Sequence, residues 1–545
     1  MGRMDRDSCL ERLRQRPELW DVIVIGGGAT GLGTALEAAA RGYRTLLLEQ
    51  HDFAKATSSR STKLVHGGVR YLQQGNVSLV MEALKERGRL LTNAPHIAHN
   101  LRFVIPVYDW WEGPFYGVGM KLYDLLAGKL GLGPSKMLSR EETLKLLPNI
   151  EAKGLRNGII YYDGQFDDAR LAISLAATVA DLGGMPLNYV KVTKLKKSGG
   201  LVSGVQAQDM ETGEELEFDG RVVVNATGIF SDDIRQMDDP AEQRLIAPSQ
   251  GVHLVLDGAF LTGESAIMAP KTADGRVLFA VPWHGRIIVG TTDTAIEDTP
   301  LEPRAREEEV QFLLEHAALY LDRDPTREDV LSIYCGVRPL VRSPGDKGTA
   351  ALSRDHVLMI AKSNLVTITG GKWTTYRKMA EDTIDAAALV AGLEERPSQT
   401  ARLRLHGWLA QPIETPGLLS LYGSEGRLVQ GVMAEEPSWD EPLHPRLPYF
   451  AGEVAWAVRR EMARSVEDVL SRRTRALLLD ARASLETAPK VAAIMAKELG
   501  RDESWVKTQV AAYSDLARGY ILKPTLTHSA PRAGSLLSRS AREGI

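Results

Sequence analysis

The stretch DVIVIGGGATGLGTALEAAARG, residues 21–42, constrains the fold of this chain more than any other part of it. The apolar run before the glycines predicts a buried strand, and the Ala-rich run after them predicts a helix. A second apolar run, TLLLE, predicts a strand that ends at Glu49. Gly26, Gly28 and Gly31 have the spacing at which a tight turn, a close approach to a pyrophosphate and helix–strand packing require glycine. The sequence therefore predicts a βαβ unit that binds a dinucleotide, with Glu49 on a ribose hydroxyl.

A second segment, VVVNATGIFSDDI at residues 222–234, indicates which dinucleotide is bound. It resembles the segment by which flavoproteins of the glutathione-reductase and D-amino-acid-oxidase type return the chain to the first nucleotide site, here through Ala226, Thr227 and Gly228. The chain has no second GxGxxG for a separate nicotinamide cofactor. We therefore predict FAD rather than NAD, with an ordinary strand-to-helix turn as the other interpretation of NATG.

Composition argues against several classes of protein. The 545 residues carry a formal net charge of -4, whereas a nucleic-acid partner usually needs a basic face. Only Cys9 and Cys335 are present, so we expect no disulfide framework and a reducing compartment. We expect neither a secretory signal nor a membrane span, because the N-terminal stretch is charged throughout and no run of about 18 apolar residues occurs. Peripheral membrane contact stays open, and no cluster of metal ligands is predicted.

The segment ATSSRSTKLVHGGVRYLQ, residues 56–73, is unusual both for a core strand and for a surface helix. Its hydroxyl groups can donate to phosphate or ribityl oxygens, and its glycines permit a flat ring to approach the backbone. We expect His66, Arg70 and Tyr71 to point towards the reacting face. The alternative is a Ser/Thr-rich loop that caps a helix, with His66 as a structural histidine.

At this point the sequence resembles a known family. ATSS and KLVHGGVRYL are followed, in family order, by YDGQFDDARL (162–171), GTTD (290–293), YCGVRPL (334–340), SRDH (353–356) and GGKWTTYRKMAE (370–381). Together they are similar to the FAD-dependent glycerol-3-phosphate dehydrogenases, the respiratory kind that passes electrons to quinone. The resemblance runs over roughly residues 20–520. One departure is the sequence Ser-Gln-Gly-Val-His at 249–253, where the family often has Lys-Gly-Ser-His, so the contact made by that Lys is in doubt.

The resemblance implies a reaction and its partners. sn-Glycerol 3-phosphate would be oxidised to dihydroxyacetone phosphate, with hydride transfer to N5 of FAD and electrons passed to a quinone. Three alternatives stay open: a glycerol-3-phosphate oxidase that produces hydrogen peroxide, a related flavin amine or amino-acid oxidase, and a flavin-binding module without turnover. The implied location is cytoplasmic and peripheral on the inner face of the cell membrane, and a homodimer is possible.

The resemblance also assigns roles to individual residues. Guanidinium groups suit a phosphate, and a base with a pKa near the working pH favours histidine. The phosphate candidates are Arg338 and Arg354, with Arg70 and Lys372 close by. The candidate bases are His66 and His253, between which the sequence does not decide. Lys372 could instead polarise the substrate oxygen, and Tyr71 and Thr375 add hydrogen bonds. The predicted cofactor-binding residues are Gly26, Gly28, Gly31, Glu49, Thr57, Ser58, Ser59, Thr62, Lys63, Leu64, His66, Gly67, Gly68, Ala226, Thr227, Gly228, Asp293, Gly370, Gly371 and Lys372.

The predicted fold is α/β and α+β, with three domains. A Rossmann-type FAD-binding domain of the D-amino-acid-oxidase-like kind takes residues 20–95, 155–235 and 340–390. A mixed, β-rich substrate or cap domain takes residues 96–154 and 236–339. A helical C-terminal domain takes residues 400–530, after a Pro-punctuated linker. Its many arginines suggest either a solvated amphipathic bundle or a surface for anionic lipid or a partner. We expect the last residues, from Ala530, to be disordered.

Overall fold

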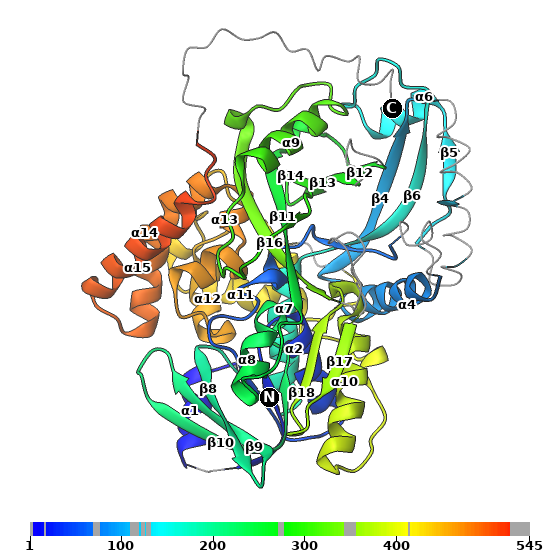
Figure 1. The fold of residues 1–545 in the computed structure, drawn as a ribbon. Coiled ribbons are helices and arrows are strands. Elements are labelled where there is room, and N and C mark those ends of the chain that lie inside the picture. Colours follow the sequence, from blue (N-terminus) through cyan, green and yellow to red (C-terminus); the bar gives the residue numbers. More distant parts are fainter. Residues whose placement is uncertain are drawn as a thin grey trace.

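The described part of the chain folds into two β-sheets with their covering helices and a helical C-terminal domain (Figure 1). The computed structural model describes residues 4–15, 18–68, 77–109, 119–120, 126, 132–270, 277–342, 356–411 and 415–523. Arg70, Tyr71 and Arg354, which were predicted to bind substrate, lie outside the described residues. So does the terminal segment that was predicted to be disordered.

The first sheet has eight strands and contains the predicted βαβ unit. Its main path runs β17-β18-β10-β1-β2-β7, and β1 pairs in parallel with both β2 and β10. The bounds are β1 (Leu19–Ile25), β2 (Thr45–Leu48), β7 (Met185–Leu187), β10 (Glu215–Asn225), β17 (His356–Ile360) and β18 (Val366–Gly370). The carboxyl ends of β1, β2, β10 and β18 therefore meet at one edge, where ligands bind in open α/β sheets.

Both faces of this sheet are covered. Val22 and Val24 pack in one hydrophobic core with the helices α2 (Ala29–Ala40), α7 (Asp168–Asp181) and α10 (Tyr376–Ala391). Ile23 and Ile25, which point to the other face, pack with Leu10 of α1 (Arg6–Gln15) and with the hairpin of β8 (Val190–Ser198) and β9 (Leu201–Asp209). A strand buried on both faces has no polar alternation, which explains the continuous apolar run in the sequence.

The second sheet has ten strands and carries the residues predicted to bind substrate. Its path runs β15-β11-β14-β13-β12-β4-β6-β3, with β16 beside β11 and β5 beside β6. Helix α9 (Glu307–Ala318) packs on one face through a core that includes Val252, Leu254 and Leu313. The bounds are β3 (Leu64–Val65), β4 (Ala98–Val107), β5 (Lys136–Leu138), β6 (Asn157–Phe166), β11 (Ile246–Asp257), β12 (Ser265–Ala269), β13 (Leu278–Trp283), β14 (Arg286–Gly290), β15 (Thr294–Ala295) and β16 (Val330–Val341).

Strand pairing corrects one predicted domain boundary. The sequence assigned residues 155–235 to the FAD-binding domain, but β6 within that range pairs with β4 over its whole length and belongs to the second sheet. The short strand β3 also pairs with β6. The pairing of β6 depends on β4, about 60 residues earlier, so no local signal could reveal it. The remaining division into three domains stays a prediction.

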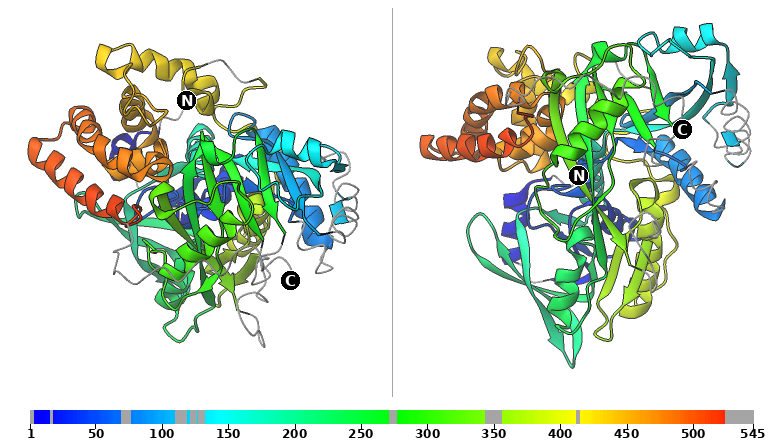
Figure 2. Two further views of the ribbon diagram at one scale, coloured as in Figure 1. Left: turned by 90° about the horizontal axis from the view of Figure 1, so that it is seen from above. Right: turned by 45° about the horizontal axis from the view of Figure 1, so that its top comes forward.

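The C-terminal domain packs against both sheet regions (Figure 2). Its helical segments are α11 (Gly426–Met433), α12 (Gly452–Glu461), a π-helical turn (Asp468–Arg473), α13 (Ala476–Leu479), α14 (Ala481–Leu499) and α15 (Glu503–Arg518). Helix α6 (Arg140–Leu146) lies beside the second sheet in Figure 1, whereas helix α4 (Val77–Asn93) also packs against the first-sheet layer, with Leu90 in its core and an ion pair between Glu86 and Arg377 of α10. Within the described part of the chain, no helix is long and apolar enough to cross a membrane.

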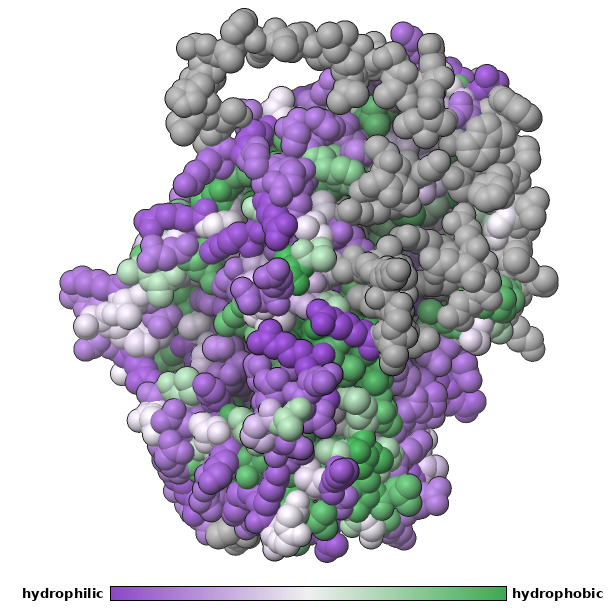
Figure 3. All heavy atoms as spheres, viewed as in Figure 1, coloured by the Kyte–Doolittle hydropathy of each residue, from purple (hydrophilic) through white to green (hydrophobic). Residues whose placement is uncertain are grey.

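Three arginines of this domain, Arg472, Arg473 and Arg475, are buried and so take no part in a solvated or lipid-binding surface, which stays a prediction for the other arginines. Arg472 and Arg473 both bind the carboxylate of Asp52, and Arg475 binds Asp167 with an Nε–Oδ2 distance of 2.8 Å. Buried charges persist only when they are paired, and these partners come from distant sequence. Hydrophilic residues cover much of the face in Figure 3, and apolar residues gather over its lower part, near β17 and β18.

Candidate functional site

The turn between β1 and α2 is so closely packed that its glycines leave little room for a side chain. Gly26 has φ +108°, and a Cβ there would lie 2.7 Å from the carbonyl oxygen of Ala226. A Cβ on Gly31 would lie 1.8 Å from the carbonyl oxygen of Gly26, so α2 packs against the turn only because this residue is glycine. A Cβ on Gly28 would approach Ser58 Oγ to 3.0 Å. The first two contacts match the tight turn and the close packing that the spacing predicted for Gly26 and Gly31, and the approach of Gly28 to a pyrophosphate stays a prediction.

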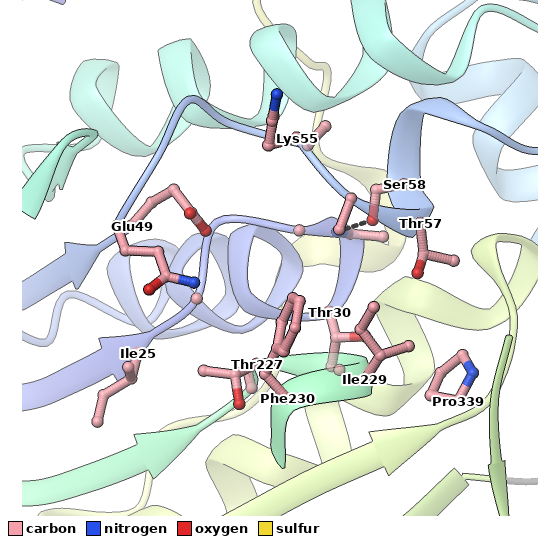
Figure 4. Close-up of a pocket in the computed structure, with 18 of the residues that line it drawn as sticks. Ile25, Thr30, Glu49, Lys55, Thr57, Ser58, Thr227, Ile229, Phe230 and Pro339 are labelled. Atoms are coloured by element: carbon pink, nitrogen blue, oxygen red, sulfur yellow. Dashed lines mark hydrogen bonds between the residues drawn. The ribbon is translucent and has the colours of Figure 1, made fainter. Parts of the chain in front are cut away.

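A cavity of about 400 Å³ opens at the carboxyl edge of the first sheet (Figure 4). Helix α2 begins at this cavity, and its N-cap residue, Gly28, makes no side-chain cap. The positive end of the helix dipole and the backbone N–H groups therefore face the space, as anions require. The predicted residues that line the cavity are Gly26, Gly28, Glu49, Thr57, Ser58, Ala226, Thr227, Gly228, Gly370, Gly371 and Lys372.

Glu49 follows β2 and lines the cavity beside the glycine turn (Figure 4). Its Oε2 accepts a hydrogen bond from Gly27 N at 2.6 Å, and its Oε1 accepts one from His51 N at 2.8 Å. Burial raises the pKa of the Glu49 carboxyl group, and the two backbone hydrogen bonds oppose that rise. The carboxylate thus also holds the turn in shape, in addition to its predicted contact with a ribose.

Two of the predicted hydroxyl residues, Thr57 and Ser58, lie on the cavity wall. Thr57 Oγ1 donates to Val337 O at 2.7 Å, which ties the loop to β16. Ser58 Oγ accepts from Ala29 N at 2.9 Å, and Ser58 O accepts from Trp373 Nε1 at 2.9 Å. This loop is therefore joined to both sheets, and its backbone is fixed where a dinucleotide passes.

The side chains of Ser59, Lys63 and Leu64 face the protein interior. Lys63 Nζ binds both carboxylate oxygens of Asp168, at 2.7 and 2.8 Å, and donates to Ser59 O at 2.7 Å. Leu64 packs in a hydrophobic cluster with Phe103. Both side chains are buried and neither is among the residues that line the cavity, so the predicted contact of Lys63 and Leu64 with the cofactor stays a prediction.

His253 lies in a buried aromatic stack on β11. Its ring is stacked on Tyr334 with centroids 4.7 Å apart and planes 10° apart, and its Nε2 lies 2.8 Å from Thr62 Oγ1. The two rings meet because β11 pairs with β16 in a register that places His253 directly opposite Tyr334. Burial, aided by the charges of Arg338 and Lys63, lowers the pKa of His253 well below its ordinary value. The imidazole is therefore neutral at neutral pH.

Arg338 lies on β16 opposite Ser249 of β11. Its Nη2 donates to Thr292 O at 3.1 Å, and its Nη1 lies 3.3 Å from Asp293 Oδ1, which also accepts from Ser249 Oγ. The Arg338 side chain is about a quarter exposed. The GTTD segment thus orients Arg338 through Thr292 O and Asp293, and the predicted contact of Asp293 with the cofactor stays a prediction.

The departure from the family pattern places an uncharged glutamine where the family often has a lysine. Counted from the shared glycine and histidine, Gln250 stands where the family often has Lys. Its amide Nε2 donates to Glu309 Oε2 at 2.8 Å and to Arg304 O at 2.9 Å. Gln250 is buried, so its amide ties β11 to α9. The Gln250 amide is used in these two hydrogen bonds, so the contact that a lysine would make at this position stays in doubt.

The end of the cavity opposite Glu49 is formed by the turn after β18. Gly370 and Gly371 have φ of +78° and +70°, and Lys372 follows them on the cavity wall. Thr375 is buried and its Oγ1 donates to Lys372 O at 3.3 Å, so the hydroxyl shapes this turn. His66, Gly67 and Gly68 follow β3 at the end of a described segment, and Gly68 has φ +75°. The choice between His66 and His253 as the base therefore stays open.

The cavity fits FAD on its own geometry. Its lining combines a glycine cradle, a helix N-terminus without a side-chain cap, the acid Glu49 and a glycine turn with Lys372. The size suits a bound cofactor, since such pockets have about 300–1,000 Å³.

Comparison with known proteins agrees with this geometry. Residues 21–377 match the model of the FAD dependent oxidoreductase family, and residues 364–506 match the C-terminal domain of alpha-glycerophosphate oxidase. The mitochondrial glycerol-3-phosphate dehydrogenase of Macaca fascicularis is 41% identical over an alignment of 534 residues that covers 91% of this chain and 73% of that protein. That of Arabidopsis thaliana is 40% identical over 533 residues, 90% of this chain and 84% of its own length. The chain belongs to the FAD-dependent glycerol-3-phosphate dehydrogenase family.

Solved structures of related proteins share the fold. The glycerol-3-phosphate dehydrogenase of Bacillus halodurans, complexed with FAD, is 30% identical and has a TM-score of 0.77, with 95% of this chain and 97% of that chain covered. The L-alpha-glycerophosphate oxidase of Mycoplasma pneumoniae is 18% identical, with a TM-score of 0.56 and 72% of this chain covered, and shows the fold alone. The predictions of the family, of FAD and of the fold class are confirmed.

Several cavity residues of this dehydrogenase-family chain were missed by sequence reasoning. They come from the start of β8, from the helical segment after NATG, from the loop before α9 and from β16: Val190, Lys191, Val192, Phe230, Asp233, Met237, Leu301 and Pro339. Phe230, Asp233 and Pro339 stand in or beside segments that the sequence singled out, whereas the other residues have no motif around them. Their place in the cavity follows from the fold, in which β8 belongs to the first sheet and β16 contacts β18.

Proposed function

We propose that this protein oxidises sn-glycerol 3-phosphate to dihydroxyacetone phosphate with bound FAD and passes the electrons to a quinone. The observation that carries the proposal is the pairing of β11 with β16, which sets His253 and Arg338 on adjacent strands, with Arg338 next in sequence to the cavity residue Pro339. FAD, when bound, supplies the acceptor for the hydride from C2 of the substrate. The protein has to hold the phosphate, remove the proton of the hydroxyl group and orient the C2 atom.

Arg338 is the proposed phosphate anchor. A guanidinium binds phosphate oxygens through two parallel hydrogen bonds, provided that the group is fixed in direction. Thr292 O and Asp293 hold this guanidinium in a fixed direction, and the Arg338 side chain is about a quarter exposed. Arg70 and Arg354 remain proposed partners in phosphate binding, and Tyr71 is proposed to donate a hydrogen bond.

His253 and His66 are the proposed candidates for the base. A base must be unprotonated before the reaction, and the lowered pKa of His253 meets that requirement at neutral pH. The stack on Tyr334 and the contact with Thr62 fix the imidazole plane. We propose that Lys372 holds the developing negative charge on the substrate oxygen, because a cation placed there stabilises the transition state.

The electron acceptor, the membrane contact and a homodimer are proposals that rest on the resemblance to the respiratory enzymes. An oxidase that delivers electrons to oxygen is the second candidate, because residues 364–506 match a domain model named for alpha-glycerophosphate oxidase. Both functions require the same phosphate anchor and base, so they differ only in the acceptor.

An anaerobic experiment separates these functions. Purified yellow protein is mixed with glycerol 3-phosphate without oxygen, and the flavin absorbance band is followed. Bleaching that a soluble quinone reverses faster than air supports the dehydrogenase. Bleaching that oxygen reverses with formation of hydrogen peroxide supports the oxidase, and absence of bleaching by this substrate contradicts both.

A further inference from the structure

The loop of residues 50–59 forms one wall of the FAD cavity. Gln50, His51, Ala54, Lys55, Ala56, Thr57 and Ser58 all line it. The loop connects β2 to β3 and has only a short 3-10 turn at Thr57–Ser59. Such a segment has little regular structure of its own, so its shape depends on contacts with other elements.

The side chain of Lys55 is held from outside the cavity. In Figure 4 it points away from the other labelled side chains. Its Nζ forms an ion pair with Glu467 and lies 3.0 Å from Glu302 Oε1. The Lys55 side chain is only 10% exposed and each carboxylate only 22% exposed, so these ion pairs are largely shielded from water. Glu467 belongs to the C-terminal domain, far from the loop in sequence.

The same C-terminal segment holds the loop at a second point. Arg472 Nε lies 2.5 Å from Asp52 Oδ2, and Arg472 Nη1 lies 2.9 Å from Glu467 Oε1. Arg473 Nη1 and Nη2 lie 2.6 and 2.8 Å from the two oxygens of Asp52. Arg472 therefore links the two anchors, Asp52 and Lys55, through one buried network.

A third set of contacts holds the chain just after the loop, at Arg60. Arg60 Nη2 lies 2.6 Å from Glu302 Oε1, and Tyr520, which follows α15, donates from its hydroxyl to Glu302 Oε2 at 3.0 Å. Glu302 thus joins Lys55, Arg60 and the end of the C-terminal domain. The Arg60 and Lys55 charges hold the pKa of Glu302 below its ordinary value, so it is ionised at neutral pH.

We propose that the helical C-terminal domain retains FAD in this enzyme, with Glu467 as a positioning residue that acts through Lys55. Removal of one member of a buried ionic network leaves the other charges unpaired, which is costly. The loop then moves away from its position on the cavity wall and FAD leaves more easily. The proposal requires FAD in the cavity but is independent of which substrate reduces it.

The test measures FAD dissociation from the full-length holoenzyme. Glu467→Gln keeps the size of the side chain and removes its charge. We expect FAD release, followed by the rise of free-flavin fluorescence on dilution, to be about tenfold faster, which equals about 1.4 kcal/mol. In the combined variant Lys55→Met with Glu467→Gln, FAD release should accelerate by much less than the product of the two separate accelerations, because both changes break the same contact. Release that is unchanged or slower in Glu467→Gln overturns the proposal, because the charge of Glu467 would then not hold the loop against FAD.

Glu498→Gln is the matched control. Glu498 is also in the C-terminal domain, is 10% exposed, and pairs with Arg459 at 2.5 Å away from the loop. It should leave the FAD dissociation rate unchanged, even where the unfolding temperature falls. Equal acceleration in Glu498→Gln and Glu467→Gln overturns the proposal, because both would then act by loosening the whole domain.

A second pair of variants keeps the test decisive where Glu467→Gln does not fold. Lys55→Arg keeps a cation between Glu302 and Glu467, whereas Lys55→Met removes it. We expect FAD release near the wild-type rate in Lys55→Arg and clearly faster release in Lys55→Met. Equal rates of FAD release in these two variants contradict the proposal that the charge of Lys55 holds the loop.

Discussion

Replacement of Lys63 by methionine tests whether a buried ion pair holds the loop before β3. The Lys63 side chain is fully buried, and its ammonium binds both oxygens of Asp168. Methionine keeps most of the apolar stem but leaves the Asp168 carboxylate without its counter-charge. Removal of one partner of a buried pair costs about 3–5 kcal/mol.

The structure places this variant at the lower end of that range. Asp168 keeps hydrogen bonds from Ser61 N at 3.1 Å, from Ser61 Oγ at 2.7 Å and from Ala169 N at 2.8 Å. These donors continue to stabilise the negative charge. We therefore expect Lys63→Met to lower the free energy of unfolding by about 3 kcal/mol.

The assay is urea unfolding of the flavin-free protein, followed by tryptophan fluorescence. Lys63→Met combined with Asp168→Asn removes both charges and should recover most of the loss. Lys507→Met, which breaks the exposed pair with Glu503 in α15, is the control and should change the free energy by no more than about 0.5 kcal/mol. A loss of less than about 1 kcal/mol in Lys63→Met would refute the argument that this pair anchors the loop.

Three further predictions concern the cofactor, the substrate and pH. Gly28→Val should give protein without the flavin absorbance band, because a side chain there fills the space at the start of α2. Arg338→Ala should raise the KM for glycerol 3-phosphate about 10–100-fold at unchanged flavin content, since a hydrogen bond to a charged group contributes about 1.5–3 kcal/mol; an unchanged KM would contradict its role. His406 lies between Asp181 and Glu425, which raise its pKa to about 9 against the opposing effect of burial. Its stabilising charge is complete below about pH 6.5 and is lost as pH rises through about 9, so His406→Gln should flatten the decline of unfolding temperature over that interval.

The nucleotide turn and the motif segments were predictable because their physics is local. Gly26 needs a positive φ, and Gly31 needs the absence of a Cβ, whatever the rest of the chain does. The apolar run of β1 follows from burial on both faces. The order of the motifs indicated the family, and through it FAD and the fold class, before any contact was known.

The burial and partners of the charged residues were decided by the tertiary structure. In the sequence, Arg472 is one arginine among many on an amphipathic helix, and Lys63 is one cation in a polar loop. In the fold, Arg472 meets Asp52 across 420 residues and Lys63 meets Asp168 across 105. Whether a charge is solvated or buried depends on what the rest of the chain places around it, and a local pattern contains no information about that.

The same division holds within the site. The sequence by itself determined that this chain binds a dinucleotide at the end of its first strand, because the backbone turn there allows only glycine. The stack of His253 on Tyr334, the support of Arg338 by Asp293 and the place of β6 in the second sheet came only from the tertiary structure. The physical reason is that local sterics act within a few residues, whereas strand register, stacking and desolvation act between segments that the chain brings together only on folding.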